Sequence, residues 1–186
     1  MSVKLSPLAE QRIEEIKKLY PDQKSAVMPA LYLAQEELGH ITPEAITWVS
    51  EKVGIAPVHV MEVATFYTMY YKKPVGRYHV QVCRTLACAL CGSRKLTERL
   101  KDRFGLKPNE VSADGMWSYE EVECLGSCGT GPMCEINDTF FENLTPEKLD
   151  QILDQIGQER PDLRFSTLRD SLGEGLKGRT KSEVLG

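Results

Sequence analysis

The cysteines of this chain fall in two short segments, and this grouping constrains the fold more than any other feature. The first segment reads "VCRTLACALCGS" and the second, about three dozen residues later, reads "VECLGSCGTGPMCEIN". The six positions are Cys83, Cys88, Cys91, Cys124, Cys128 and Cys134. The chain must therefore fold so that two loops meet around whatever their sulfur atoms hold.

Composition narrows the classes of protein that such a chain can belong to. The 186 residues are 41% hydrophobic and carry a net charge of -4, with no basic block that would indicate nucleic-acid binding. No apolar run approaches the ~18 residues of a membrane span, and the N-terminus lacks the apolar core of a secretory signal. We therefore expect an intracellular protein without direct membrane insertion. In a reducing compartment, grouped cysteines more often bind metal or do redox work than form disulfides.

The first part of the chain, residues 1–74, has the pattern of a small helical bundle. Four segments carry helical spacing or helix start and stop signals. They cover residues 6–20, 25–39, 42–54 and 56–71. Thr42 and Pro43 begin the third segment, and Gly54 follows its end.

The pattern changes after a break at residues 72–76. Strand alternation in 77–83 is followed by an amphipathic helix over 93–105 and by a turn and strand within 114–124. Two short strands then flank a tight turn at Asn137-Asp138, and residues 145–157 repeat the Thr-Pro-Glu helix start. This order predicts an α/β (α+β) fold in which residues 75–156 form a sandwich of thioredoxin-like type. Residues 157–186 are mixed-charge and glycine-containing, and we expect them to form an extended or partly disordered tail.

Each cysteine cluster begins at the end of a predicted strand, where α/β layers usually build sites. The spacings are Cys83-x4-Cys88 and Cys124-x3-Cys128, and neither is the x2 spacing favoured by zinc ribbons. Two such pairs suit a 2Fe–2S core, with two thiolates for each iron. Cys134 alternates with Ile136 and is expected to be buried as a small apolar side chain.

Cys91 stands at the entrance of the next helix, where packing is again the favoured interpretation. Residues near the four candidate ligands fit a cluster that carries a net charge of about -2 when oxidised, because such a charge needs hydrogen-bond donors in a low-dielectric loop. Glycines would let backbone amides approach sulfur, and nearby polar side chains could donate to it. The candidates are Gly126, Gly129, Gly131, Arg84, Thr85 and Ser127.

The histidines and the aromatic residues give weaker indications of function than the cysteines do. The histidines at 40, 59 and 79 are scattered, and His79 is expected to face solvent or the sheet rather than a metal. The aromatic run of residues 65–71 could form a flavin or quinone surface, but we favour a role in sealing the bundle onto the sheet. No phosphate-binding loop and no catalytic triad can be proposed, so no catalytic residue is expected in this chain.

Two alternatives to the 2Fe–2S site remain open on the residues alone. A structural zinc module could use the same thiols, and the Cys88-Ala-Leu-Cys91 pair could serve as a zinc half-site. The same pair could instead be the dithiol of a thiol–disulfide enzyme, if a helix start lowered the pKa of one thiol.

Three longer sequence segments resemble those of a known protein family. The segments "EVATFYTMYYKKPVGRYHVQVC", "VSADGMWSYEEVECLGSC" and "LTPEKLDQIL" closely resemble the E subunit of NADH-quinone oxidoreductase, the thioredoxin-like 2Fe–2S ferredoxin of respiratory complex I. The resemblance covers roughly residues 10–155. Related subunits occur in NAD-reducing hydrogenases and NAD-dependent formate dehydrogenases.

The resemblance implies one 2Fe–2S cluster whose ligands fall on Cys83, Cys88, Cys124 and Cys128. It implies a stable partnership with a subunit that binds NADH and FMN, from which this chain's cluster takes one electron as a side branch of the main path. The chain would then be a non-catalytic, electron-carrying subunit of an NADH dehydrogenase. It would be cytoplasmic and peripheral on the cytoplasmic face of the inner membrane.

Overall fold

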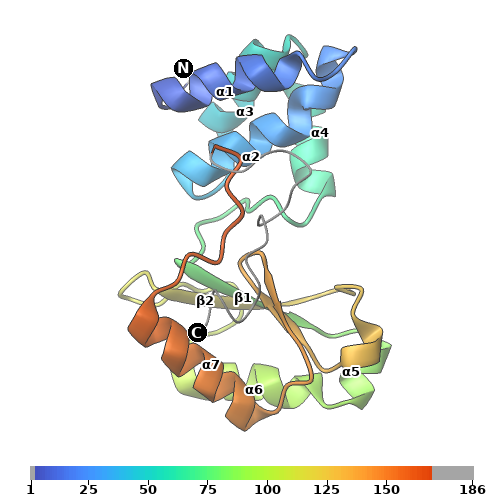
Figure 1. Cartoon of the computed structure of the whole chain (residues 1–186), viewed down its shortest axis with the longest axis vertical. Helices are drawn as coiled ribbons and strands as arrows, with labels where there is room; N and C mark the ends of the chain where they lie inside the picture. The colour runs from blue at the N-terminus through green and yellow to red at the C-terminus, as the bar shows by residue number, and fades with distance from the viewer. Residues whose placement is uncertain (1–2, 169–186) are drawn as a thin grey trace. The chain divides into compact units, whose positions relative to one another are not determined.

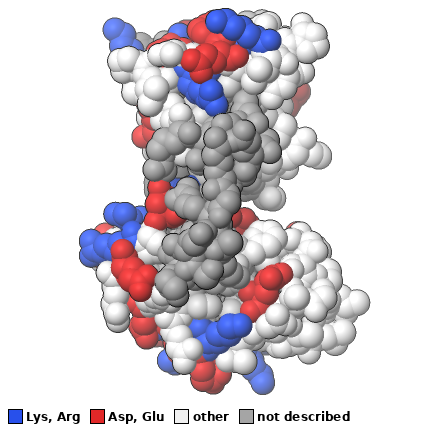
Figure 2. All heavy atoms as spheres, in the orientation of Figure 1, with Lys and Arg blue, Asp and Glu red and all other residues white. Residues whose placement is uncertain are grey.

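The computed structural model describes residues 3–168, which divide into two compact units. One unit comprises residues 3–74 together with 166–168, and the other comprises residues 75–165. On the face seen in Figure 2, acidic and basic side chains are interspersed over both units. Among the described residues, none of the helices combines the length and the apolar character that crossing a bilayer would require.

The first unit is a bundle of four helices with one short 3-10 turn. The elements are α1 (Pro7–Lys17), η1 (Gln23–Ala26), α2 (Val27–Leu38), α3 (Pro43–Val53) and α4 (Pro57–Phe66). The predicted start and stop signals are confirmed, because the hydroxyl of Thr42 accepts from the amide of Ala45 and Gly54 closes α3 in the left-handed conformation. The indole of Trp48 is buried among the helices and donates to Glu10 at 2.8 Å.

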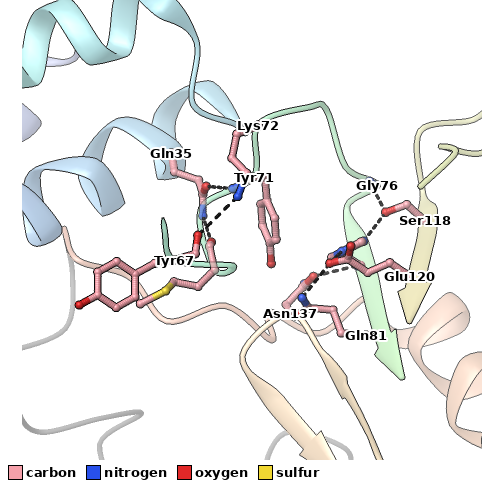
Figure 3. Close-up of polar contacts among 11 residues, drawn as sticks. Gln35, Tyr67, Tyr71, Lys72, Gly76, Gln81, Ser118, Glu120 and Asn137 are labelled. Atoms are coloured by element: carbon pink, nitrogen blue, oxygen red, sulfur yellow. Dashed lines mark hydrogen bonds and ion pairs between the residues drawn. The ribbon is translucent and has the colours of Figure 1, made fainter. Parts of the chain in front are cut away.

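The chain that leaves α4 is held back against α2 by one side chain. Gln35 donates from its amide nitrogen to the carbonyl oxygen of Met69 at 2.9 Å, and its Oε1 accepts from the amide of Tyr71 at 2.6 Å (Figure 3). Tyr70, between these two residues, is fully buried and donates to the carbonyl oxygen of Met28. The aromatic segment is thus fixed to its own unit.

The second unit is built on a four-stranded sheet of order β2-β1-β3-β4. Its strands are β1 (Tyr78–Cys83), β2 (Trp117–Val122), β3 (Cys134–Ile136) and β4 (Thr139–Phe141). β1 pairs in parallel with β2 and antiparallel with β3, and β3 pairs antiparallel with β4. The predicted hairpin turn is confirmed, with Ile136 opposite Thr139 and Asn137 in the left-handed conformation at φ 53.

The helices of this unit lie on one face of the sheet. α6 (Ser93–Phe104) links β1 to β2, and α7 (Pro146–Glu159) follows β4 and packs beside α6 (Figure 1). Between them and the sheet, one apolar core collects alternate residues of β1 with residues of both helices. A short helix, α5 (Leu86–Leu90), precedes α6. This α+β arrangement agrees with the predicted fold class.

The structure orders the first part of the segment that we expected to be a tail. α7 extends to Glu159, and Leu163 is buried in the core of the second unit. Ser166 and Thr167 are buried as well, and the amide of Thr167 donates to Glu36 at 2.9 Å. The remainder of the expected tail, residues 169–186, lies outside the described residues.

Candidate metal centre

The two cysteine loops meet because they leave neighbouring parallel strands at the same end. Cys83 is the last residue of β1 and stands opposite Val122, the last residue of β2. Cys124 follows two residues after Val122, and the amide of Arg84 donates to the carbonyl oxygen of Val122 at 3.0 Å. Parallel pairing places both carboxyl ends at one edge of the sheet, so the loops that follow are neighbours.

A short turn of helix presents the second thiol of each loop. Cys88 lies in the middle of α5, and Cys128 begins the 3-10 turn η2 (Cys128–Thr130). The two pairs differ in solvent access: Cys83 and Cys88 are both buried at 1% exposure, whereas Cys124 and Cys128 are exposed.

The structure brings all four predicted thiols together. The Sγ atoms of Cys124 and Cys128 lie 3.8 Å apart, and Cys83 and Cys88 also interact side chain to side chain. The hydroxyl of Thr85 lies 3.2 Å from the Sγ of Cys83 and also forms a hydrogen bond with Cys124, so it joins the two loops.

Within each pair of cysteines, the pKa values of the two thiols shift in opposite directions. Burial raises the pKa of the Cys83 thiol, but the Thr85 hydroxyl and the Leu125 amide outweigh it, so that pKa lies below its ordinary value. Burial, followed by the hydrogen bond and charge of Cys83, raises the pKa of Cys88 to about 11.

In the second loop, the amide of Gly126 and then the side chain of Cys128 lower the pKa of Cys124. The hydrogen bond and charge of Cys124 raise the pKa of Cys128. Within each pair, the pKa of one thiol is therefore lowered and the pKa of its neighbour is raised.

Two of the predicted glycines contact the thiols. The amide of Gly126 lies 3.4 Å from the Sγ of Cys124, and Gly126 has a left-handed φ of 83. At Gly131, a Cβ atom would lie 3.2 Å from the Sγ of Cys88, which is tighter than ordinary van der Waals contact. At Gly129, by contrast, a Cβ would meet nothing within 4 Å.

The other predicted neighbours of the thiols are engaged elsewhere. Arg84 pairs with Glu123 at the exposed surface, and Ser127 donates to the carboxylate of Glu142. Glu142 did not emerge from the sequence, because it lies 14 residues beyond Cys128 in another element. The one sequence signal that could have placed Glu142 near the thiols is its position directly after a predicted strand of the same sheet.

The two remaining cysteines have different environments. Cys134 is fully buried in the core on β3, as predicted. The expectation that Cys91 packs in the interior is wrong, because Cys91 is exposed. The chain turns at the surface there, between α5 and the left-handed Gly92 that precedes α6, and the thiol stays accessible to solvent.

His79 lies in a polar network on the sheet and makes its contacts there. It is 2% exposed, and its ring nitrogens lie 2.7 Å from the hydroxyl of Ser118 and 3.0 Å from Glu120. The same Glu120 oxygen accepts from Gln81, and Ser118 accepts from the amide of Gly76 (Figure 3). The expectation that His79 faces the sheet rather than a metal agrees with these contacts.

The aromatic run separates into buried and exposed members. Tyr70 is buried within the helical unit, but Phe66 is 79% exposed and Tyr67 is 36% exposed. Phe66 is the last residue of α4, and Tyr70 is the member of the run that joins the core of the helical unit.

The four thiols fit a metal centre in which each of two metal ions binds two of them. Two sulfur ligands at about 2.3 Å from one tetrahedral ion lie about 3.8 Å apart, which is the separation found between Cys124 and Cys128. Cys83 and Cys88 form the corresponding pair from the other loop. Within residues 3–168, three or more His, Cys, Asp or Glu side chains do not converge on a position for a single metal ion.

Comparison with known proteins identifies a family for this chain. A family model for the thioredoxin-like [2Fe-2S] ferredoxin matches residues 13–157. This chain belongs to that family. The second NADH-quinone oxidoreductase E subunit of Rhizobium meliloti is 39% identical over 144 residues, covering 77% of this chain and 86% of that protein. NADH-quinone oxidoreductase subunit 2 of Thermus thermophilus is 42% identical over 144 residues, covering 76% and 80% respectively.

The fold also recurs within a larger solved protein. An NAD+-reducing [NiFe]-hydrogenase in the air-oxidised state matches with a TM-score of 0.63 at 21% identity. The match covers 73% of this ferredoxin-family chain but 23% of the hydrogenase chain. At that identity the match shows the shared fold, and the family assignment depends on the closer sequence relatives.

Proposed function

We propose that this chain is the electron-carrying 2Fe–2S subunit of an NADH-quinone oxidoreductase. Cys83 and Cys88 would hold one iron, and Cys124 and Cys128 the other. The observation that carries the proposal is the meeting of four thiols, sorted two by two, at the shared end of β1 and β2. Family membership and the relatives from NADH-quinone oxidoreductases support the same conclusion.

When bound, a 2Fe–2S cluster supplies one-electron chemistry. The residues of this chain supply its surroundings. Thr85 and the amide of Gly126 direct hydrogen-bond donors at sulfur, which stabilises additional negative charge there. Burial of Cys83 and Cys88 excludes water from one side of the site. The lack of a side chain at Gly131 leaves the Sγ of Cys88 its space.

The finer part of the proposal concerns the partner. The cluster would exchange its electron with the FMN of an NADH-binding subunit, so part of the surface near the thiols must be covered in the assembly. α5 supports this, because Leu86 and Leu90 flank the buried Cys88 and are 74% and 80% exposed. Two large apolar side chains at helical i, i+4 spacing present an apolar surface beside the site. In such an assembly the chain would be peripheral on the cytoplasmic face of the membrane and would have no active site of its own.

A second assembly remains a candidate on a specific observation. The fold recurs in an NAD+-reducing [NiFe]-hydrogenase, so the same subunit role could be served in a hydrogenase. The sequence resemblance extends the alternative to an NAD-dependent formate dehydrogenase. Co-purification of the native complex, followed by identification of its other subunits, separates these assemblies.

The thiol–disulfide alternative has little support from the site. A reactive dithiol requires a thiol with a lowered pKa near a helix start, whereas burial raises the pKa of Cys88 to about 11.

Anaerobic reconstitution of the full chain tests the proposal. We expect about two irons and two labile sulfides per chain, and a paramagnetic signal on one-electron reduction. The double change Cys124→Ser, Cys128→Ser should abolish the iron and sulfide content and the paramagnetic signal, and Cys91→Ser should leave all of these intact. Stoichiometric zinc without sulfide would instead establish the structural zinc module. A cluster that survives intact in the Cys124→Ser, Cys128→Ser chain would overturn the assignment.

A further inference from the structure

The second cysteine loop is anchored by a carboxylate from a distant part of the sheet. Glu142 directly follows β4, and its Oε1 accepts from the hydroxyls of both Ser127 and Thr130. The Thr130 bond is 2.6 Å long, and the two hydroxyl oxygens are themselves 2.6 Å apart. These two residues bracket Cys128 along the chain, so one carboxylate oxygen holds both ends of the turn that presents the thiol.

The backbone around Glu142 gives that carboxylate a fixed position. The amide of Asn143 donates to the carbonyl oxygen of Thr130 at 2.7 Å, and the amide of Leu144 donates to that of Pro132 at 3.0 Å. From α7, the ammonium of Lys148 reaches the carbonyl oxygen of Glu142 at 3.2 Å. The segment after β4 is thus tied both to the loop and to the helix that follows it.

The loop itself has little else to define its shape. η2 is a single 3-10 turn of three residues, and no residue of it is buried. Cys128 is exposed, in contrast to Cys88, which is buried within α5. A thiol ligand on an exposed turn depends on neighbouring hydrogen bonds for its position, and bonds to a carboxylate are about twice as strong as neutral ones.

We infer that Glu142 is a positioning residue for the metal centre, acting through Ser127 and Thr130 to hold Cys128 in place. This inference rests on the proposed function for the identity of the bound group. Glu142 has a second effect, because its carboxylate adds negative charge beside the turn that carries Cys128. This charge disfavours further negative charge at the site and so lowers the reduction potential.

The rate of cluster loss tests the positioning role in the reconstituted full chain. We expect Glu142→Ala to lose iron to an external chelator about tenfold faster than the unaltered chain, the lower end of the usual effect of residues that orient metal ligands. Ser127→Ala combined with Thr130→Val should give a similar acceleration. The triple variant should be no faster than either, because all three side chains act as one unit.

The control is Glu123→Ala, which removes another carboxylate side chain, next to Cys124 in the chain. Glu123 is exposed and its bonds are to Arg84, so the rate of cluster loss should be unchanged. Glu142→Gln distinguishes charge from contact, since its amide oxygen still accepts a hydrogen bond. It should raise the midpoint potential while accelerating cluster loss less than Glu142→Ala does.

Each result decides the inference. Additive effects of the Glu142 and Ser127/Thr130 changes, or equal rates in Glu142→Ala and Glu123→Ala, would overturn the positioning role. An unchanged or lowered potential in Glu142→Gln would overturn the electrostatic role. Failure of the unaltered chain to hold a cluster would count against the proposed function instead. Hydrogen exchange of the amides of residues 126–131 in the cluster-free chain gives an independent readout, and it should accelerate in Glu142→Ala.

Discussion

Gly131→Ala should weaken the metal centre while leaving the fold intact. The backbone at Gly131 has a φ of -69, which alanine adopts without strain, so only the space for the new methyl group matters. That methyl would lie 3.2 Å from the Sγ of Cys88, against about 3.5–4.0 Å for an unstrained contact. The sulfur must therefore retreat by about 0.3–0.8 Å.

A displacement of that size exceeds what a metal site tolerates. Ligand distances in working sites fall within about 0.2 Å of their ideal values, so the retreat of Cys88 should weaken cluster binding about 10- to 100-fold. In the cluster-free chain, no bound group fixes the position of the Cys88 side chain, so the unfolding free energy should fall by only about 1 kcal/mol, the lower end of the usual cost of an added group in a packed site.

Two further glycine changes serve as controls for Gly131→Ala. Gly129→Ala lies in the same loop, where the added methyl would meet nothing within 4 Å, and it should retain the cluster as the unaltered chain does. Gly76→Ala would place the methyl 2.5 Å from the backbone carbonyl carbon of Trp117 and should destabilise the sheet itself. Anaerobic chelator kinetics and thermal unfolding of the cluster-free chain measure the two effects separately. Equal rates of cluster loss in Gly131→Ala and Gly129→Ala would refute the steric argument.

Three other results are expected. Thr85→Val removes the hydroxyl that lies against the thiols of both loops, so it should lower the midpoint potential of the reconstituted chain, and Thr85→Ser should restore it. Burial, followed by the charge of Asp138, raises the pKa of Glu135 from 4.5 to about 7. Between these two pH values, the folded chain therefore binds more protons than the unfolded chain does. Stability measured by urea unfolding should therefore fall as the pH rises from about 4.5 to about 7, and Glu135→Gln should remove this part of the dependence. Replacing both Leu86 and Leu90 by serine should reduce co-purification with the flavin-bearing subunit without changing iron content, and unchanged recovery would show that α5 is not the contact surface.

Much of the fold could be read from local signals. The Thr-Pro-Glu starts at Thr42 and Thr145 and the glycine stop at Gly54 fix helix ends through contacts within a few residues. The same holds for the turn at Asn137, because a two-residue hairpin is specified by its own backbone.

What depends on tertiary packing was harder to predict. The exposure of Cys91 could not be predicted from its spacing, since α5 is a short helix in which Cys88 is the buried residue. The outward position of Phe66 depends on where α4 ends and the chain bends. Glu142 becomes part of the site only through pairing of β4 with β3, which leaves no mark in the cysteine motifs.

The parallel pairing of β1 with β2 also has a consequence for biogenesis. One thiol pair is synthesised with β1, but its counterpart emerges only after the crossover through α6, and the two meet only when β2 has docked. A nascent polypeptide that ends before Trp117 therefore presents half of a site. On the proposed function, a cluster that needs all four thiols can be completed only after β2 and the loop that follows it have been synthesised and β2 has paired with β1.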